Sequence, residues 1–343
     1  MAGLNCTSMK KVRIAQFGLG PIGLESLRLA AAQSWLEVIG AVDNDPAKAG
    51  RSLVELTGLP VLDGLRVASS LDELFRENEP EVILHTASSS ARATLEQLRP
   101  ALEFGVSAAS TCEELIFPAL RYPEMVKEYD ALCRHTKARV VAAGVNPGFV
   151  MDLLPICLTG VCRSVDTIEV ERVVDAATRR GPLQAKIGCG QRPEGFLLQL
   201  QAGRAGHAGL RESVALVAHA LGWELAAIEE SGEPVVADRR MQTKFFTVEA
   251  GEVCGIHQRA TGSMDSRPKI ILDIRMFLEA PQPHDRIIIH GNPGLDVMVN
   301  GGVAGEDATV ASLINAVPRL LAAPPGLRLL HELAVPAWAG GRV

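Results

Sequence analysis

Short apolar runs alternate with amphipathic segments through the first 145 residues of the chain. The apolar runs end in glycine or in polar turns, as buried parallel strands do; they cover Val12–Phe17, Leu36–Val42, Glu81–Ala87, Val106–Ser110 and Arg139–Gly144. The intervening segments are typical of helices with one apolar face; they cover Pro21–Ala32, Ser70–Glu77, Ala91–Glu103 and Glu124–Cys133. Strands that alternate with helices predict a doubly wound parallel sheet.

The pattern changes after Gly144. Residues 166–173 and 234–278 alternate with a period of two, which predicts strands with one buried face. Within the second stretch, residues 243–262 are expected to form two strands around a turn at Ala250–Gly251. These features predict an α+β arrangement with a largely antiparallel or mixed sheet.

Two further helices complete the expected layout. One covers His207–Trp223, and the other covers Ala304–Leu321 with a kink at Pro318. A length of 343 residues suits two domains. We expect one domain over residues 1–145, an α+β domain for substrate binding and oligomerisation over 146–300, and a helical segment over 301–343 that returns to the first domain.

Charge and cysteine content narrow the class of protein. Lys and Arg number 34 against 40 Asp and Glu, so the chain lacks the basic balance of nucleic-acid binders and is not expected to bind anionic membranes. The seven cysteines form no C-x-x-C pair and no zinc spacing, so we expect reduced thiols, no metal site and a cytoplasmic protein; they are Cys6, Cys112, Cys133, Cys157, Cys162, Cys189 and Cys254. The N-terminus has no apolar signal segment, and no apolar run is long enough to span a membrane.

A glycine motif follows the first expected strand. Gly18, Gly20 and Gly23 fit G-x-G-x-x-G between a strand and a helix, where they allow a tight turn, close approach of a pyrophosphate and close helix packing. Asp43 ends the second strand, 20 residues after Gly23, where a carboxylate can accept hydrogen bonds from ribose hydroxyls. This order of elements predicts a Rossmann domain that binds NAD or NADP.

The preference between the two cofactors stays open. Asp43 argues for NAD because a carboxylate repels a 2′-phosphate, whereas Lys48 and Arg51 follow closely enough to pair with that phosphate. These two cations equally fit a solvated helix face.

Two segments are expected at the carboxyl edge of the parallel sheet, where open α/β proteins bind ligands. Residues 85–90 (HTASSS) end one strand, and they suit either a place between pyrophosphate and nicotinamide or a plain turn. Residues 110–118 (STCEELIFP) end the next strand and bring Glu113 and Glu114 to the same edge. Carboxylates beside an apolar wall suit proton transfer, but the pair also fits a helix start stabilised by the macrodipole.

Two polar residues are candidates near the domain crossing. Asn146 precedes a proline and is held extended, so its amide either points into a cleft or belongs to a structural turn. His207 precedes an amphipathic helix and is either a cap or a pocket residue.

Six segments together resemble the 2,4-diaminopentanoate dehydrogenase family, which includes the native amine dehydrogenases and is related to dihydrodipicolinate reductases. They are GLGPIG, STCEEL, GVNPGFVMD, RRGPLQAKIGCG, GHAGLRESVALVAHALGW and GGVAGEDATVASLINAVPRLLAAPPGL, in this order along most of the chain. The resemblance implies an NAD(P)-dependent enzyme that interconverts an amine with a ketone or aldehyde plus ammonia, and a homodimer.

The resemblance also implies site residues. It places a glutamate of the EEL segment near the reacting nitrogen, with Glu114 as first choice and Glu113 as second. The expected cofactor-binding residues are Gly18, Gly20, Pro21, Ile22, Gly23, Asp43, Asn44, Arg51, Thr86, Ala87, Ser88, Asn146 and Pro147. Looser candidates for the substrate pocket are Arg172, His207, His290 and Thr309.

One departure separates the chain from the dihydrodipicolinate reductases, which carry a His-His pair and a nearby lysine in the second domain. The corresponding stretch, residues 171–186, has Val173 and Val174 and no histidine. The expected activity is therefore reductive amination of a small ketone or aldehyde. The alternatives are another NAD(P)-dependent imine or carbonyl reductase of the same group and a non-enzymatic NAD(P) sensor.

Overall fold

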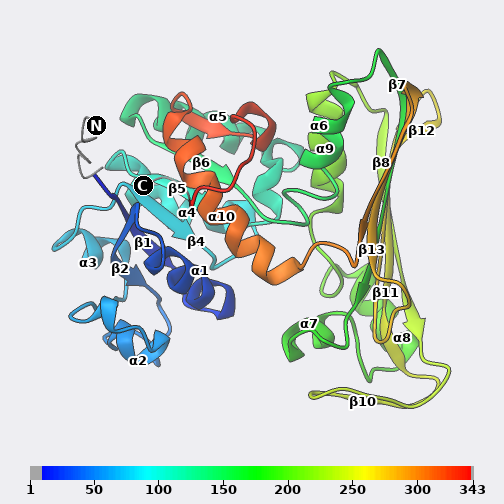
Figure 1. Ribbon diagram of the computed structural model, residues 1–343, viewed down its shortest axis with the longest axis horizontal. Helices are drawn as coiled ribbons and strands as arrows, with labels where there is room; N and C mark the ends of the chain where they lie inside the picture. The colour runs from blue at the N-terminus through cyan, green and yellow to red at the C-terminus, as the bar shows by residue number, and fades with distance from the viewer. Residues whose placement is uncertain (1–9, 341–343) are drawn as a thin grey trace, which may run out of the picture. The chain divides into compact units, whose positions relative to one another are not determined.

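The strand that precedes the glycine motif is an interior strand of a parallel sheet. In the computed structural model, which describes residues 10–340, Ile14 and Ala15 of this strand are fully buried. The sheet has seven strands in the order β15-β6-β5-β4-β1-β2-β3 (Figure 1). The strands are β1 Val12–Phe17, β2 Leu36–Val42, β3 Val67–Ala68, β4 Val82–His85, β5 Ser107–Ser110, β6 Arg139–Ala142 and β15 Gly326–Arg328. All pairs are parallel, so the carboxyl ends of β1, β4 and β5 meet at one edge.

Helices accompany the strands of this sheet. They are α1 Pro21–Ala31, α2 Leu53–Thr57, α3 Leu71–Phe75, α4 Ala91–Glu103, α5 Pro123–Thr136 and α10 Gly305–Ala322, with short 3-10 turns η1 Pro60–Leu62, η2 Glu114–Ile116, η3 Pro118–Leu120 and η4 Leu330–Glu332. Their apolar faces supply the core through side chains such as Leu27 of α1 and Leu95 and Leu98 of α4, all fully buried.

The chain divides into two compact units, of which the parallel sheet forms the first. This unit comprises residues 1–144 together with 306–343, and the second comprises residues 145–305. The C-terminal segment adds more than the expected helix to the first unit, because β15 pairs with β6 at the edge of the sheet. Helix α10 runs through Pro318 without ending there.

The second unit contains a six-stranded mixed sheet. Its order is β14-β13-β7-β12-β11-β8, and only the β12–β7 pair is parallel. The strands are β7 Ser164–Asp175, β8 Ala227–Val236, β11 Val253–Met264, β12 Arg267–Phe277, β13 His284–Asn292 and β14 Leu295–Asn300. The parallel sheet of the first unit and this mixed sheet confirm the predicted fold class.

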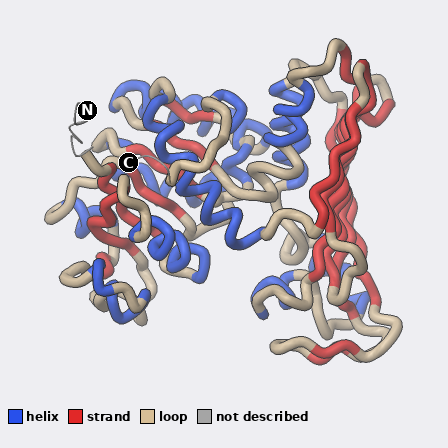
Figure 2. Tube along the Cα trace, viewed as in Figure 1, coloured by secondary structure: helices blue, strands red, loops and turns tan. Residues whose placement is uncertain are grey.

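Helices α6 Leu153–Thr159 and α9 Leu210–Ala220 lie on one side of the mixed sheet (Figures 1 and 2). Alternate residues of β12, such as Ile270, Leu272 and Ile274, are fully buried, as the period-two pattern predicts. Helices α7 Gly181–Lys186 and α8 Pro193–Gln201 also belong to this unit.

The two strands expected around the turn at Ala250–Gly251 are present, as β10 and β11, but they do not pair with each other. Strand β10 Thr247–Val248 pairs with β9 Met241–Gln242, whereas β11 pairs with β8 and β12. Alternation along the chain marks strands but does not choose their partners, and the two long neighbours offer β11 far more backbone hydrogen bonds than two-residue β10 does. None of the helices in the described part of the chain is long and apolar enough to cross a bilayer.

Candidate active site

The turn between β1 and α1 has the shape that the glycine motif predicts. Gly18 has a φ of +89°, and a side chain there would also meet Ala87 at about 3 Å. A Cβ on Gly23 would lie 1.9 Å from the Gly18 carbonyl oxygen, so only glycine lets α1 approach the turn this closely. A Cβ on Gly20 would meet no other atom within 4 Å, so the backbone of Gly20 is open to a ligand.

The N-terminus of α1 is free to receive an anion. Pro21 is its first residue, and Gly20 provides no side chain to cap the helix. The first N–H groups of α1 therefore lack a side-chain acceptor, and the helix dipole favours negative charge at this end. Pro21 is exposed and Ile22 half-buried. The turn and helix start fit the pyrophosphate of a dinucleotide.

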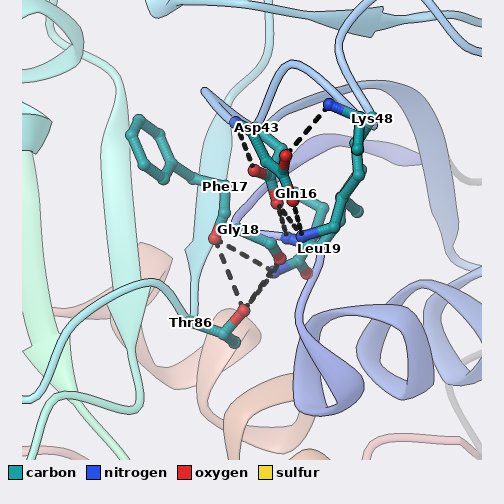
Figure 3. Close-up of polar contacts among 9 residues, drawn as sticks. Gln16, Phe17, Gly18, Leu19, Asp43, Lys48 and Thr86 are labelled. Carbon is teal, nitrogen blue, oxygen red and sulfur yellow. Dashed lines mark hydrogen bonds and ion pairs between the residues drawn. The ribbon is translucent and has the colours of Figure 1, made fainter.

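Thr86 fastens the glycine turn to the end of β4 (Figure 3). Its hydroxyl donates to the Gly18 carbonyl oxygen at 3.0 Å. The amide of Gln16 donates to that same oxygen at 3.1 Å and to the Thr86 hydroxyl at 2.9 Å. Thr86 and Ala87, both expected at the cofactor, thus touch the glycine turn, and Ser88 follows, accepting from the N–H of Ser90.

Asp43 lies at the end of β2 beside the same turn (Figure 3). Its Oδ2 accepts from the Leu19 N–H at 2.7 Å and from the Lys48 ammonium at 3.1 Å, and its Oδ1 accepts from the Asp45 N–H at 2.9 Å. Burial alone would raise the pKa of Asp43, but these hydrogen bonds and the charge of Lys48 hold it below its usual value. The carboxylate is therefore ionised and fixed, with lone pairs left for a ribose hydroxyl.

The two cations after β2 have different surroundings. Lys48 contacts both Asp43 and Asp45, whereas Arg51 is exposed and pairs with Glu55 at 3.4 Å. Neither lies on a regular helix, because α2 begins only at Leu53. Asn44 is exposed in the turn that follows β2.

A buried histidine organises the ends of β4 and β5. His85 is inaccessible to solvent, and its Nδ1 lies 2.9 Å from the Ser110 hydroxyl while its Nε2 lies 2.9 Å from Gln97 Oε1. Burial lowers the pKa of His85 to about 4. A neutral ring then donates from Nε2 to Gln97 and accepts at Nδ1 from Ser110. Ser110 in turn accepts from the Cys112 N–H, which directs the chain into the EEL segment.

The two adjacent glutamates of this segment differ in their contacts. The backbone N–H of Glu114 donates to the Ser89 carbonyl oxygen at 3.2 Å, and its Oε2 accepts from the Ala91 N–H at 2.9 Å. Its Oε1 lies 3.7 Å from Arg121 Nε. The Glu113 side chain is half-buried. The structure therefore brings Glu114 to the serine-containing segment at the carboxyl edge of the sheet and fixes its carboxylate there.

In the second unit, Asn146 and His207 present unsatisfied polar atoms. Both polar atoms of the Asn146 amide are buried without a partner among the described residues, and so is His207 Nε2. The next residue, Pro147, is buried. The backbone of His207 exchanges two hydrogen bonds with the Gln258 amide, at 2.6 and 3.2 Å. Burial, helped by the charges of Lys186 and Arg172, lowers the pKa of His207 to about 3, so its ring is neutral.

Arg172 is already occupied by a carboxylate. Its guanidinium donates to both oxygens of Asp285 at 2.7 Å and to the Val303 carbonyl oxygen at 2.7 Å. Burial lowers the pKa of Arg172, and the charge of Asp285 acts in the opposite direction. This pair satisfies the charge of the arginine within the protein.

The remaining pocket candidates have other surroundings. His290 is exposed on β13 and lies 2.9 Å from Glu169, whereas its neighbour Ile289 is buried on the other face of the strand. Thr309 lies in α10, half-buried, within the first unit. His290 therefore contacts Glu169, and this contact does not connect His290 with Asn146 or His207.

Sequence reasoning missed several polar residues that hold the site in shape, namely Gln16, Asp152, Ser213, Gln258 and Asp285. All five are nearly or fully buried. Gln16 could have been identified from the sequence, because it is a polar residue inside a largely apolar strand. The others have partners far away in sequence, such as Asp152 and Ser213, and no local pattern marks them.

Comparisons with known proteins agree on one family. A sequence model of the 2,4-diaminopentanoate dehydrogenase C-terminal domain matches residues 149–342. The 2,4-diaminopentanoate dehydrogenase of Acetoanaerobium sticklandii is 31% identical over 336 residues, covering 96% of this chain and 95% of that protein. An amine dehydrogenase of Streptomyces virginiae is 24% identical over 339 residues, covering 91% and 93%.

Solved structures show the same fold. An amine dehydrogenase from Mycobacterium smegmatis superposes with a TM-score of 0.85 at 22% identity, covering 97% of this chain and 99% of that one. A dipicolinate-bound dihydrodipicolinate reductase from Paenisporosarcina gives a TM-score of 0.53 at 13% identity, covering 93% and 97%. The family resemblance read from the six sequence segments is confirmed.

Proposed function

Because the chain belongs to the 2,4-diaminopentanoate dehydrogenase family, we propose that it is an NAD(P)-dependent amine dehydrogenase. In the reductive direction it would join ammonia to a small ketone or aldehyde, with loss of water. The bound nicotinamide would supply the hydride that reduces the iminium carbon. The observation that carries the proposal is that a dinucleotide-binding turn and a fixed carboxylate, Glu114, occupy the carboxyl edge of one sheet.

The residues of the β1–α1 turn would hold the cofactor. The backbone around Gly18 and Gly20 and the first turn of α1 face the pyrophosphate in this arrangement, and Asp43 accepts from a ribose hydroxyl. Thr86, Ala87 and Ser88 continue the site along the edge of the sheet. We propose that Asn146 and Pro147 meet the nicotinamide end, since the buried amide of Asn146 has donors and acceptors to spare.

Glu114 would manage the proton transfers. Its carboxylate can hold ammonium by a charge-assisted hydrogen bond, take up a proton and stabilise the cationic iminium. The contacts with Ala91 and Arg121 limit its rotation, and a group that is fixed in advance costs no reorganisation during the reaction. Glu113 is the second candidate, because its half-buried side chain precedes Glu114 in the same segment.

The arginine contacts favour a substrate without an α-carboxylate. Arg172 is bound on both nitrogens by Asp285 and Val303, so its use as a carboxylate clamp would leave Asp285 buried and unpaired at a cost of several kcal/mol. A neutral His207 adds a hydrogen-bonding group without adding charge. A short ketone, aldehyde or amine fits these surroundings.

The proposal is tested by following oxidation of NADH and NADPH with a panel of short ketones and aldehydes, with and without ammonium. Turnover should require ammonium. Glu114→Gln keeps an oxygen that can accept from Ala91 but cannot carry the proton, so kcat should fall about 10²- to 10⁴-fold while NAD(P)H binding persists.

Glu113→Gln is the matched control, and a much smaller loss is expected from it. A large loss confined to Glu113→Gln would assign the proton transfer to Glu113 instead. Normal turnover in both variants would exclude a catalytic glutamate in this segment. Cofactor oxidation that is independent of ammonium would favour a different imine or carbonyl reductase of the same group, and cofactor binding with no turnover on the whole panel would favour a sensor.

We also propose a homodimer in the cytoplasm. The mixed sheet has α6 and α9 on one side, while its other face bears charges of both signs, including the Arg286–Asp296 and Arg275–Glu171 pairs. A surface with both signs can meet its own copy across a two-fold axis. Six cysteines among the described residues are in no disulfide, which suits a reducing compartment; Cys6 lies outside the described residues. Sedimentation at twice the 36.6 kDa chain mass is the expected result.

A further inference from the structure

A fully buried carboxylate sits behind the turn that carries Asn146. Asp152 has no solvent exposure. Its Oδ2 accepts from the Gly148 N–H at 2.8 Å and from the Ser213 hydroxyl at 2.7 Å, and its Oδ1 accepts from the Leu153 N–H at 2.6 Å. Three donors from three places in the chain thus converge on one side chain.

These donors belong to the segments that bear the unsatisfied polar groups. Gly148 lies two residues after Asn146, and Ser213 lies in α9, which begins three residues after His207. The turn itself is closed by the Val145 carbonyl oxygen, which accepts from the N–H groups of Phe149 and Val150. Asp152 therefore joins the Asn146 turn to the helix that follows His207.

From this geometry we infer that Asp152, together with Ser213, is a positioning pair that sets the Asn146 amide relative to His207. The inference rests on the proposed function, in which the Asn146 amide meets the nicotinamide and His207 borders the substrate. Neither Asp152 nor Ser213 reaches solvent, so their effect on the reaction is carried through the turn and α9.

A carboxylate is suited to this place because every neighbour donates. An ionised Asp is an acceptor only, whereas the amide of an Asn would turn an NH₂ group toward a donor and break at least one of the three contacts. Burial raises the pKa of Asp152, which the bonds from Ser213, Gly148 and Leu153 oppose. A hydrophobic contact would hold the same elements together without burying a charge, but it would not fix the direction of the Gly148 N–H.

The test compares kcat and the Kd for NAD(P)H of Asp152→Asn and Ser213→Ala with those of wild type. The measurements are made at a temperature below the midpoint of thermal unfolding of each variant. Asp152→Asn should lower kcat by about 10²-fold, because small displacements of reacting groups have effects of this size. Ser213→Ala removes one of three bonds and should lower kcat by about tenfold. The Kd for NAD(P)H should rise far less than kcat falls, because the β1–α1 turn, which holds the pyrophosphate and the ribose in the proposed function, is untouched.

Hydrogen–deuterium exchange provides a readout that needs no turnover. Amides of the segment 145–154 should exchange faster in both variants, and more so in Asp152→Asn. Ser70→Ala is the control: Ser70 caps α3 through the Glu73 N–H in the first unit, so this variant should lose a little stability while kcat and the exchange of 145–154 stay at wild-type values.

Two results would overturn the inference. Unchanged exchange over 145–154 would show that Asp152 does not hold the turn, and wild-type kcat in a folded Asp152→Asn with faster exchange would show that the turn does not position the reaction. A wild-type protein without ammonium-dependent turnover would instead reject the proposed function, and the positioning role with it. An active wild type with unaffected variants rejects the positioning role alone.

Discussion

Asp43 acts on two neighbours at once. Its carboxylate holds the Leu19 N–H of the glycine turn and the ammonium of Lys48. Removing this carboxylate would loosen the turn and, in the proposed cofactor site, leave a ribose hydroxyl without an acceptor. In the proposed cofactor site, Asp43 and Lys48 bring both signs of charge to the place where NAD and NADP differ, so residue type alone does not choose between the two cofactors.

Variants of these residues separate the two cofactors. Asp43→Ala should weaken NADH binding by about tenfold or more, since hydrogen bonds to charged groups contribute about 1.5–3 kcal/mol. Lys48→Ala should raise the Kd of NADPH about tenfold and that of NADH less, because only NADPH carries a 2′-phosphate with which the cation can pair. Fluorescence titration of each variant measures both constants.

Arg51→Ala is the comparison variant, since Arg51 pairs with Glu55 and not with Asp43. A selective loss of NADPH affinity in Arg51→Ala would move the phosphate contact to that residue. Unchanged NADH affinity in Asp43→Ala would remove Asp43 from the cofactor site.

At the scale of elements, two glycines of the β1–α1 turn have different surroundings. Gly23 is needed because α1 packs against the Gly18 carbonyl oxygen, while Gly20 borders open space. The same motif thus contains one glycine that helix packing requires and one whose surroundings are open.

This difference predicts that Gly20→Ala affects cofactor binding, whereas Gly23→Ala affects stability. Gly20→Ala should melt like wild type, yet bind NAD(P)H at least about tenfold more weakly, because its methyl group occupies the approach of the pyrophosphate. Gly23→Ala should lose stability by about 1–3 kcal/mol or more, as overpacked sites do. Thermal unfolding and cofactor titration of both proteins distinguish the effects; normal binding by Gly20→Ala would be incompatible with this view of the turn.

At the scale of the whole molecule, each unit contains a histidine that is buried in its neutral form. His85 lies in the first unit and His207 in the second. Their pKa values fall from 6.5 to about 4 and about 3. Below pH 6.5 the unfolded chain therefore binds more protons at these sites than the folded protein does.

The contribution of these histidines to the free energy of unfolding should consequently be fully present above pH 6.5. It should decline as the pH falls toward 4, by up to about 1.4 kcal/mol per pH unit for each histidine. His85→Gln removes one titrating group and should flatten the dependence of the urea midpoint between pH 6.5 and 4.5. Carboxylates contribute equally to both proteins, so the difference in slope isolates His85. Parallel pH profiles of the two proteins would show that His85 is not buried as a neutral ring.

The sequence by itself determined the features that depend on local order. Strand, glycines, helix, second strand and Asp43 follow one another along the chain, and each step is dictated by backbone sterics and hydrophobic periodicity. The parallel sheet and the position of the glycine turn could therefore be predicted. The period-two alternation predicted a largely antiparallel or mixed second sheet, and the structure shows a mixed one. The helix expected over His207–Trp223 lies within three residues of either end of α9.

The tertiary structure decided what depends on contacts between distant residues. It distinguished Glu114 from Glu113 through the Ala91 N–H, 23 residues away, which fixes the Glu114 carboxylate, and it bound Arg172 to Asp285, 113 residues away. It also paired Asp152 with Ser213, and β11 with β8 and β12. No periodicity encodes such pairs, because a hydrogen bond between remote side chains exists only once the core has fixed both of their backbones.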